Sequence, residues 1–85
     1  MKTIKEHEYN KSMGILIDVR DPVSYQMNHH IDSINIYYDK LLMNHRSLLD
    51  KNKAYFLICD KGQRSKQATR ILEFYGYNVT FVINS

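Results

Sequence analysis

The sequence predicts an α/β domain with a mostly parallel central sheet of about four to five strands, flanked by helices on both faces. Two runs, "ILIDV" (15–19) and "AYFLI" (54–58), are continuously apolar, as expected for strands covered on both sides. Helical signals fall between the strand-like runs, and this alternation is typical of a parallel sheet. The 85 residues contain no repeat or linker, so we expect a single domain over residues 1–85.

The first half of the chain supplies three strands and one helix. "KTI" near the start suits a short edge strand, and the apolar run at 15–19 follows it. Asp21 before Pro22 is a good N-cap followed by a proline at the first helical position, which predicts a short helix over 22–28. "INIYY" predicts a further strand over 34–38.

The second half contains the longest predicted helix. Residues 39–50 suggest one or two helical turns, with four leucines turned inward: Leu41, Leu42, Leu48 and Leu49. A helix over 65–75 is predicted by an apolar stripe at i, i+3, i+4 and i+7, formed by Ala68, Ile71, Leu72 and Tyr75. Gly76 then predicts a left-handed C-cap, with Tyr77 packing back on the helix end and a last strand over 79–83.

The composition is that of an ordinary globular domain. Apolar residues make up 44% and charged residues 25%, and the net charge is +3. No run approaches the roughly 18 apolar residues of a membrane span, and "MKTIKEHEYNKS" lacks the apolar centre of a signal peptide. We therefore expect a cytoplasmic protein whose partners include neither a membrane nor a nucleic acid.

The chain has one cysteine, Cys59, which limits its chemistry. A single cysteine makes no internal disulfide, no C-x-x-C zinc site and no dithiol redox pair. The four histidines are scattered and none stands at metal-ligand spacing with the cysteine. We expect neither a metal nor another cofactor.

The position of Cys59 makes it a candidate nucleophile. It leaves the run 54–58 at its carboxyl end, while Asp18 and Arg20 leave the run 15–19 at its own. Ligands of parallel α/β sheets bind outside the carboxyl ends of the strands. If these two strands are neighbours, the three residues share one rim.

The segment after Cys59, "CDKGQRS", is suited to holding an anion. Gly62 allows successive N–H groups to point inward, and the positive end of the following helix favours a thiolate. Residues 59–70 carry a net charge of +3, to which Lys61 and Arg64 contribute. This positive surplus indicates either the entrance of an anion-binding site or a solvated helix face. Cys59 itself is either a nucleophile or a small buried apolar residue.

Three segments resemble the small bacterial rhodanese-like domains. "CDKGQRS" fits the C-x-x-G-x-R-S loop of that family, "LIDVRDPVSYQMNHHIDSINI" resembles its L-I-D-V-R segment, and "ATRILEFYGYNVTFV" resembles its helix, glycine and final strand. The three occur in the right order, and the resemblance covers about residues 3–83.

The resemblance implies a rhodanese fold and a sulfurtransferase activity. Cys59 would attack the outer sulfur of a small anionic donor such as thiosulfate, hold it as a persulfide and pass it to a thiol or a protein. By position in the motifs, the resemblance also implies a set of substrate-binding residues: Asp60, Lys61, Gly62, Gln63, Arg64 and Ser65 of the loop, with Asp18 and Arg20 of the D-x-R pair.

Two departures from the family pattern carry expectations of their own. "HHIDSI" stands where the family usually has G-H-I-P-G-A, so this turn must be built differently. Family members commonly continue past the last strand into a closing helix, whereas this sequence ends at "VINS". We therefore expect one face of the sheet to be under-covered, and the protein to be a monomer or a weak homodimer.

Three functional hypotheses use the same cysteine. The first is a thiosulfate-type sulfurtransferase. The second is a persulfide relay or binding module that works with a partner protein and turns over small donors poorly. The third is a small phosphatase or arsenate reductase, although cysteine phosphatases have five residues between cysteine and arginine, and here four lie between Cys59 and Arg64.

Overall fold

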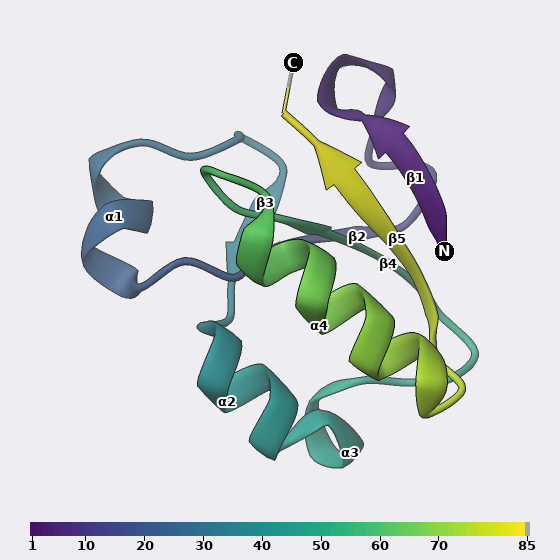
Figure 1. The fold of residues 1–85 in the computed structure, drawn as a ribbon. Coiled ribbons are helices and arrows are strands. Elements are labelled where there is room, and N and C mark those ends of the chain that lie inside the picture. Colours follow the sequence, from purple (N-terminus) through teal and green to yellow (C-terminus); the bar gives the residue numbers. More distant parts are fainter. Residues whose placement is uncertain (85) are drawn as a thin grey trace.

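The computed structural model describes residues 1–84 and contains one sheet of five parallel strands in the order β1-β5-β4-β2-β3 (Figure 1). The strands are β1 (Lys2–Lys5), β2 (Ile15–Asp18), β3 (Ser33–Asn35), β4 (Ala54–Ile58) and β5 (Asn78–Ile83). The predicted α/β class is confirmed. The buried runs of β2 and β4 are neighbours near the centre of the sheet, and the short β1 lies at an edge.

One face of the sheet is covered by helices (Figure 1). These are α2 (Tyr38–Met43), α3 (His45–Leu48) and α4 (Gln63–Phe74), while α1 (Pro22–Met27) lies beside the sheet and η1 (Glu6–Glu8) is a turn of 3-10 helix. The predicted strand over 34–38 is wrong at its end, since Tyr37 precedes the first residue of α2. The helix predicted over 65–75 is α4, which begins two residues earlier, at Gln63, and ends one residue earlier, at Phe74.

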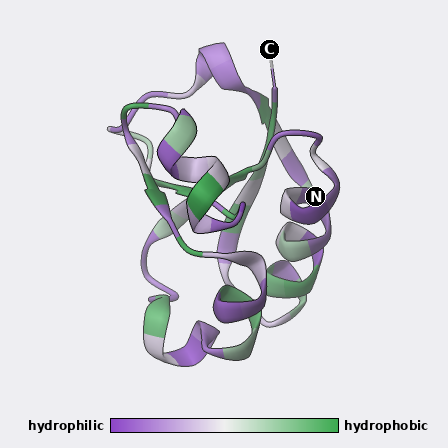
Figure 2. Ribbon diagram, turned by 90° about the vertical axis from the view of Figure 1, so that its left-hand side faces the viewer, coloured by the Kyte–Doolittle hydropathy of each residue, from purple (hydrophilic) through white to green (hydrophobic). Residues whose placement is uncertain are grey.

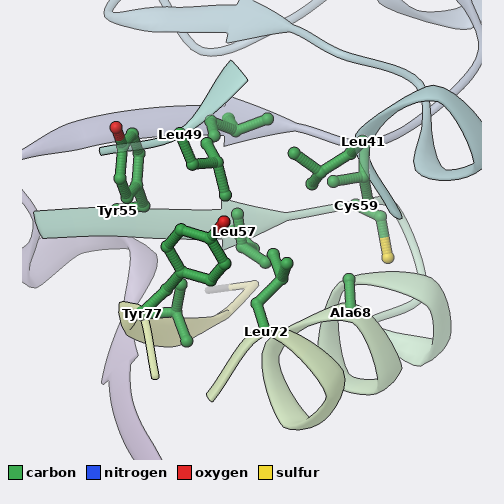
Figure 3. Packing of buried hydrophobic residues seen from close by; sticks show 11 residues of the cluster. Leu41, Leu49, Tyr55, Leu57, Cys59, Ala68, Leu72 and Tyr77 are labelled. Carbon is green, nitrogen blue, oxygen red and sulfur yellow. The ribbon is translucent and has the colours of Figure 1, made fainter. Parts of the chain in front are cut away.

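The main core lies between the sheet and these helices. Ile17, Leu57 and Leu72 have no exposed surface, and they pack in one cluster with Leu41 and Cys59 (Figure 3). Burying each such side chain contributes about 1.5–3 kcal/mol. Cys59 is therefore fixed at the end of a packed layer, where its sulfur faces Ala68 of α4 (Figure 3).

The opposite face is covered by Tyr9, the residue after η1. Its ring packs 5.2 Å from that of Phe56, and its hydroxyl donates to the carbonyl of Gly14 at 2.8 Å. Burial raises the pKa of Tyr9 above its usual value. Leu16 and Val82 on this face are 1% and 0% exposed. The expected under-covered face is therefore not found, because the chain between β1 and β2 provides the cover.

The two predicted capping residues, Asp21 and Gly76, are confirmed. The side chain of Asp21 accepts from the N–H of Ser24 at 2.8 Å and caps α1. At the end of α4, Gly76 has a φ of +93°, and the N–H of Tyr77 donates to the carbonyl of Leu72 at 3.1 Å. This is the Schellman arrangement, and it turns the chain from α4 into β5.

Two predicted core positions are wrong. Leu48 is 36% exposed and Tyr75 47% exposed, so neither belongs to the core. The buried face of α4 instead carries Ser65 and Thr69, and the Thr69 hydroxyl donates to the Ser65 carbonyl at 2.7 Å. Among residues 1–84, no helix has the length and apolar character needed to cross a membrane.

Candidate active site

Cys59 lies at the point where β4 ends and the loop to α4 begins. It is 5% exposed, and its sulfur is held by Ser65, which is fully buried in the first turn of α4. The N–H of Ser65 donates to Sγ at 3.4 Å, and the Ser65 hydroxyl lies 3.2 Å from Sγ. The sequence-predicted proximity of the thiol to a helix N-terminus is therefore present.

The loop between Cys59 and Ser65 presents free N–H groups. Gly62 is the N-cap of α4 with a φ of +78°, a left-handed conformation that favours glycine. Within residues 1–84, no hydrogen bond uses the amides of Gly62, Gln63 and Arg64. These donors and the positive end of a 12-residue helix surround the position beyond the sulfur with anion-binding groups.

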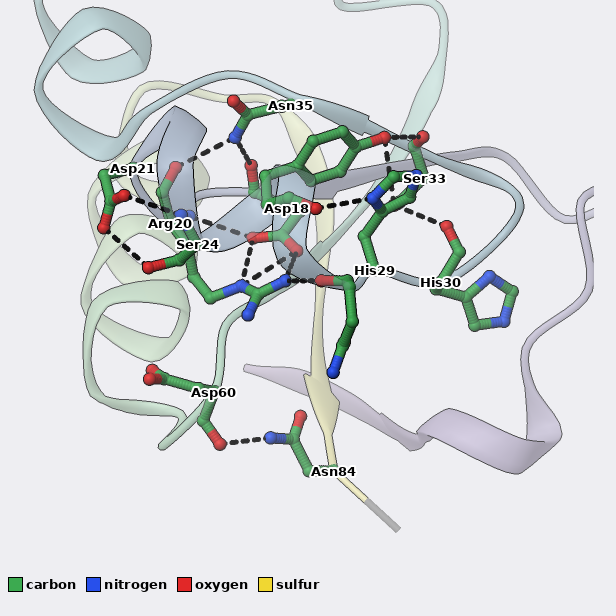
Figure 4. A network of polar contacts seen from close by, with 12 residues as sticks. Asp18, Arg20, Asp21, Ser24, His29, His30, Ser33, Asn35, Asp60 and Asn84 are labelled. Atoms are coloured by element: carbon green, nitrogen blue, oxygen red, sulfur yellow. Dashed lines mark hydrogen bonds and ion pairs between the residues drawn. The ribbon is translucent and has the colours of Figure 1, made fainter.

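Asp18 and Arg20 lie at the neighbouring strand end and pair with each other. The carboxylate of Asp18 accepts from Nε of Arg20 at 3.1 Å and from Nη2 at 2.9 Å (Figure 4). Nη2 also donates to the carbonyl of Asn28 at 2.6 Å. The hydrogen bond to Asp18 raises the pKa of Arg20 further above its usual value. The guanidinium is thus held in a salt bridge with Asp18.

Asn35 at the end of β3 fixes the chain that carries this pair. Its side-chain amide donates to the carbonyl of Asp18 at 3.0 Å and to that of Arg20 at 2.9 Å (Figure 4). The register of β2 and β4 pairs Asp18 with Ile58, directly before the cysteine. Three adjacent strands therefore position the predicted rim residues together.

A cleft of about 330 Å³ opens beside the cysteine. Four of the predicted site residues line it: Cys59, Asp60, Asp18 and Arg20. The rest of the lining comes from Glu6, Asn28, His29, His30, Ile58 and Asn84. Sequence reasoning missed Glu6 and Asn84 as site residues, although they follow the carboxyl ends of β1 and β5. The strand-end argument applied to Cys59 would also have indicated these two positions.

Five predicted site residues do not line this cleft, and two of them, Arg64 and Lys61, carry cationic side chains. Arg64 donates from Nη1 to the hydroxyl of Tyr37 at 2.9 Å, and its guanidinium lies 5.6 Å from the rings of Tyr37 and Tyr38. The Tyr37 hydrogen bond raises the pKa of Arg64 above its usual value. Lys61 lines a separate hollow with Phe81 and Ile83. The expected contribution of these two cations to the entrance of an anion-binding site is therefore not supported by their placement.

The other loop residues contribute through the backbone. Gln63 is exposed as the first residue of α4, and the Asp60 carboxylate accepts from the N–H of Lys61 at 2.9 Å. The Asp60 carbonyl accepts from the side-chain amide of Asn84, which connects the loop to the end of β5 (Figure 4). No group of three or more His, Cys, Asp or Glu side chains in residues 1–84 is placed to hold a metal ion.

A parallel α/β sheet with a buried cysteine at a strand end, cradled by the first turn of a helix, defines a class of cysteine-loop domains. Within that class, the family profile of the rhodanese-like domain matches residues 2–85. The chain belongs to the rhodanese-like domain family.

Comparison with known proteins agrees. The chain is 34% identical over 84 residues to the adenylyltransferase and sulfurtransferase UBA4 of Debaryomyces hansenii, in a match that covers 85% of this chain and 19% of that protein. The chain thus spans about a fifth of the length of this curated relative.

Solved structures show the same fold. A rhodanese-related protein from Thermoplasma volcanium has a TM-score of 0.85 at 28% identity, covering 96% of this chain and 83% of that one. The reduced CoADR-RHD of Bacillus anthracis has a TM-score of 0.86 at 32% identity, covering 95% of this chain and 15% of that one. A rhodanese with anions from E. coli has a TM-score of 0.68 at 33% identity, covering 80% and 81%.

Proposed function

We propose that the protein is a sulfurtransferase in which Cys59 carries sulfane sulfur from a thiosulfate-type donor to a nucleophilic acceptor. The observation that carries the proposal is the pair of Ser65 contacts to Sγ, at 3.4 Å from N–H and 3.2 Å from the hydroxyl, beside loop amides that have no acceptor within residues 1–84. Membership of a family with sulfurtransferase relatives supports the same chemistry.

In the first step the Cys59 thiolate attacks the outer sulfur of thiosulfate. A bond forms between Sγ and that sulfur, the sulfur–sulfur bond of the donor breaks, and sulfite leaves with the electron pair. The negative charge then rests on the outer sulfur of the persulfide, where the amides of Gly62, Gln63 and Arg64 can donate. Donors fixed before the reaction stabilise such a charge without reorganising. In the second step an acceptor nucleophile takes the outer sulfur and returns the Cys59 thiolate.

The short loop favours sulfur over phosphate chemistry. Four residues separate Cys59 from Arg64, and the Arg64 guanidinium lies on Tyr37 instead of over the sulfur. A phosphate needs charged donors for three free oxygens, whereas a persulfide adds a single atom. We therefore expect no Cys59-dependent hydrolysis of an aryl phosphate.

Intact-mass measurement after incubation with thiosulfate tests the proposal. The wild-type protein should gain one sulfur atom and lose it to cyanide or a thiol, and Cys59→Ser should gain none because oxygen forms no persulfide. Circular dichroism of Cys59→Ser checks that the fold is kept. Sulfur transfer by a correctly folded Cys59→Ser variant, or robust aryl-phosphate hydrolysis by the wild type, would contradict the assignment.

A further inference from the structure

The cleft beside Cys59 is acidic, although the segment 59–70 that contains the cysteine is basic. Its lining includes the three carboxylates of Glu6, Asp18 and Asp60 against the single guanidinium of Arg20, a net charge of −2 with the histidines neutral. Asp18 and Arg20 pair with each other, so the surplus negative charge belongs to Glu6 and Asp60.

The basic side chains of the cysteine segment do not line this cleft. Arg64 lies over two tyrosine rings and lines a neighbouring hollow with Arg20 and Asp60, and Lys61 lines another hollow with Phe81. Lys66 and Arg70 are exposed on α4 and line none of the clefts near Cys59. The lining of the cleft therefore presents the carboxylates of Glu6 and Asp60 to an approaching ligand, and no cation other than the paired Arg20.

Exposed apolar residues flank one segment of the cleft lining in sequence. Residues 28–30 line the cleft, and the residues directly before and after them, Met27 and Ile31, are 82% and 90% exposed. Val23, four residues before Met27 on α1, is 70% exposed and shares its side of the helix. Figure 2, in which α1 faces the viewer, shows hydrophobic segments on this helix. Exposed apolar side chains gathered beside a reactive group are typical of a contact surface for another protein.

We infer that the sulfur partner of Cys59 is a protein segment that carries its own cysteine among basic residues, with an apolar side chain that packs on Met27 and Ile31. This inference rests on the proposed function and deepens it, because it names the kind of acceptor or donor. Lysine or arginine complements Glu6 and Asp60, and the apolar contact supplies affinity that a small anion cannot gain.

The transfer step is balanced without a further reagent. The partner's thiolate attacks the outer sulfur of the Cys59 persulfide, a new sulfur–sulfur bond forms on the partner, and the bond to Sγ breaks. Cys59 leaves as a thiolate and the partner carries the persulfide. The reverse step loads Cys59 from a partner that already holds the sulfur.

Three capped peptides separate charge from apolar contact: Lys-Leu-Cys-Leu-Lys, Glu-Leu-Cys-Leu-Glu and Lys-Ser-Cys-Ser-Lys. Cys59 is loaded with thiosulfate, and the discharge rate to each peptide is followed by intact mass. We expect the first peptide to react fastest and its advantage over the second to shrink with added salt. For each peptide, the rate with the wild-type protein is divided by the rate with each variant described below. The intrinsic reactivity of the peptide thiol cancels in this ratio.

Matched variants locate the contacts. Glu6→Gln should slow discharge to the first peptide by about two- to threefold, the effect of one charge at roughly 10 Å in water. Glu73→Gln, at the far end of α4, should have no effect. Met27→Ser should slow it by about fivefold at sub-saturating peptide through lost apolar burial. Met43→Ser is the control: Met43 on α2 is also 82% exposed, but it is not adjacent in sequence to any residue that lines the cleft, whereas Met27 directly precedes Asn28 of the lining.

Binding is measured separately from chemistry by amide chemical shifts with a Lys-Leu-Ser-Leu-Lys peptide, which cannot accept sulfur. Shifts centred on residues 27–31 and 59–60 support the contact surface even if thiosulfate never loads Cys59, an outcome that would contradict only the proposed function. Equal discharge to basic and acidic peptides, equal effects of Met27→Ser and Met43→Ser, or shifts centred elsewhere would overturn the inference.

Discussion

Replacement of Gly62 by alanine tests whether the backbone of the loop creates the sulfur site. Gly62 has a φ of +78°, and an added Cβ would lie 3.3 Å from Cζ of Phe81. A left-handed conformation costs an L-residue roughly 1–2 kcal/mol, and the tight contact with a buried ring adds to this. For a domain of this size each kcal/mol lowers the Tm by about 4–8 °C.

The expected chemical effect is larger than the loss of stability. If the loop relaxes to a negative φ at Gly62, the amides of Gln63 and Arg64 turn away from the sulfur. Loss of one fixed donor to a developing negative charge costs about 10²–10³ in rate in other enzymes, so partial displacement should slow loading by on the order of tenfold.

Gly76→Ala is the matched control. Gly76 also has a left-handed φ, of +93°, but its added Cβ would meet only the flexible end of Lys51, with Nζ at 3.6 Å. Thermal unfolding by circular dichroism should show a loss of Tm in both variants, with the larger loss in Gly62→Ala because of its contact with Phe81. Loading by thiosulfate should fall only in Gly62→Ala. Loading at the wild-type rate in Gly62→Ala, together with the lowered Tm, would refute the argument that this glycine sets the donors around the sulfur.

Three further substitutions probe the neighbouring contacts. Asp18→Asn removes the carboxylate that pairs with Arg20 at 2.9 Å and should lower the free energy of unfolding by about 2–4 kcal/mol, measured by urea denaturation, whereas an unchanged midpoint would show that the pair is dispensable. Ser65→Ala removes the hydroxyl 3.2 Å from Sγ and should slow persulfide formation without unfolding the protein, and an unaltered rate would leave the N–H as the sole contribution of Ser65. Hydrogen bonds from Ser24 lower the pKa of Asp21, so its stabilisation is present above the ordinary Asp pKa and is lost as the pH falls through the lowered value. Asp21→Ala should therefore have a lower Tm than wild type at pH 7, and the two should converge in acid below about pH 3.9.

The sequence was sufficient to predict the strands and helix ends that obey strong local rules. Asp21–Pro22 and Gly76 each have one favoured role in a helix, and both lie where predicted. The end of the strand over 34–38 was not predictable from "INIYY". The N–H of Ile36 still bonds to the carbonyl of Asp18 at the end of β2, but that of Tyr38 bonds to the carbonyl of Val19, beyond the strand, and α2 begins there. Tertiary contacts decide that boundary, and apolar residues alone do not reveal them.

The buried face of α4 was only partly predictable for a similar reason. An apolar stripe identified Ala68 and Leu72, but it also selected Tyr75, which is 47% exposed and stacks on His45. It passed over Ser65 and Thr69, which are buried because their hydroxyls find partners at Sγ and at a helix carbonyl. Small polar residues with local hydrogen bonds can enter a core without an apolar signal.

The candidate site shows why segment charge and site charge differ. Residues 59–70 carry a net positive charge as a segment of the sequence. In the fold, however, the guanidinium of Arg64 bonds to Tyr37 and does not contact the sulfur. The groups that favour negative charge at the sulfur are backbone N–H donors. They act at hydrogen-bond distance, and so they stabilise a persulfide. The charged side chains that line the cleft are Asp60 of the loop, Glu6 at the end of β1, and the paired Asp18 and Arg20 at the end of β2. If the partner proposed above is correct, substitutions at Glu6 should change which partner reacts without changing how readily Cys59 holds sulfur, because Glu6 lies on a different strand end from the loop amides.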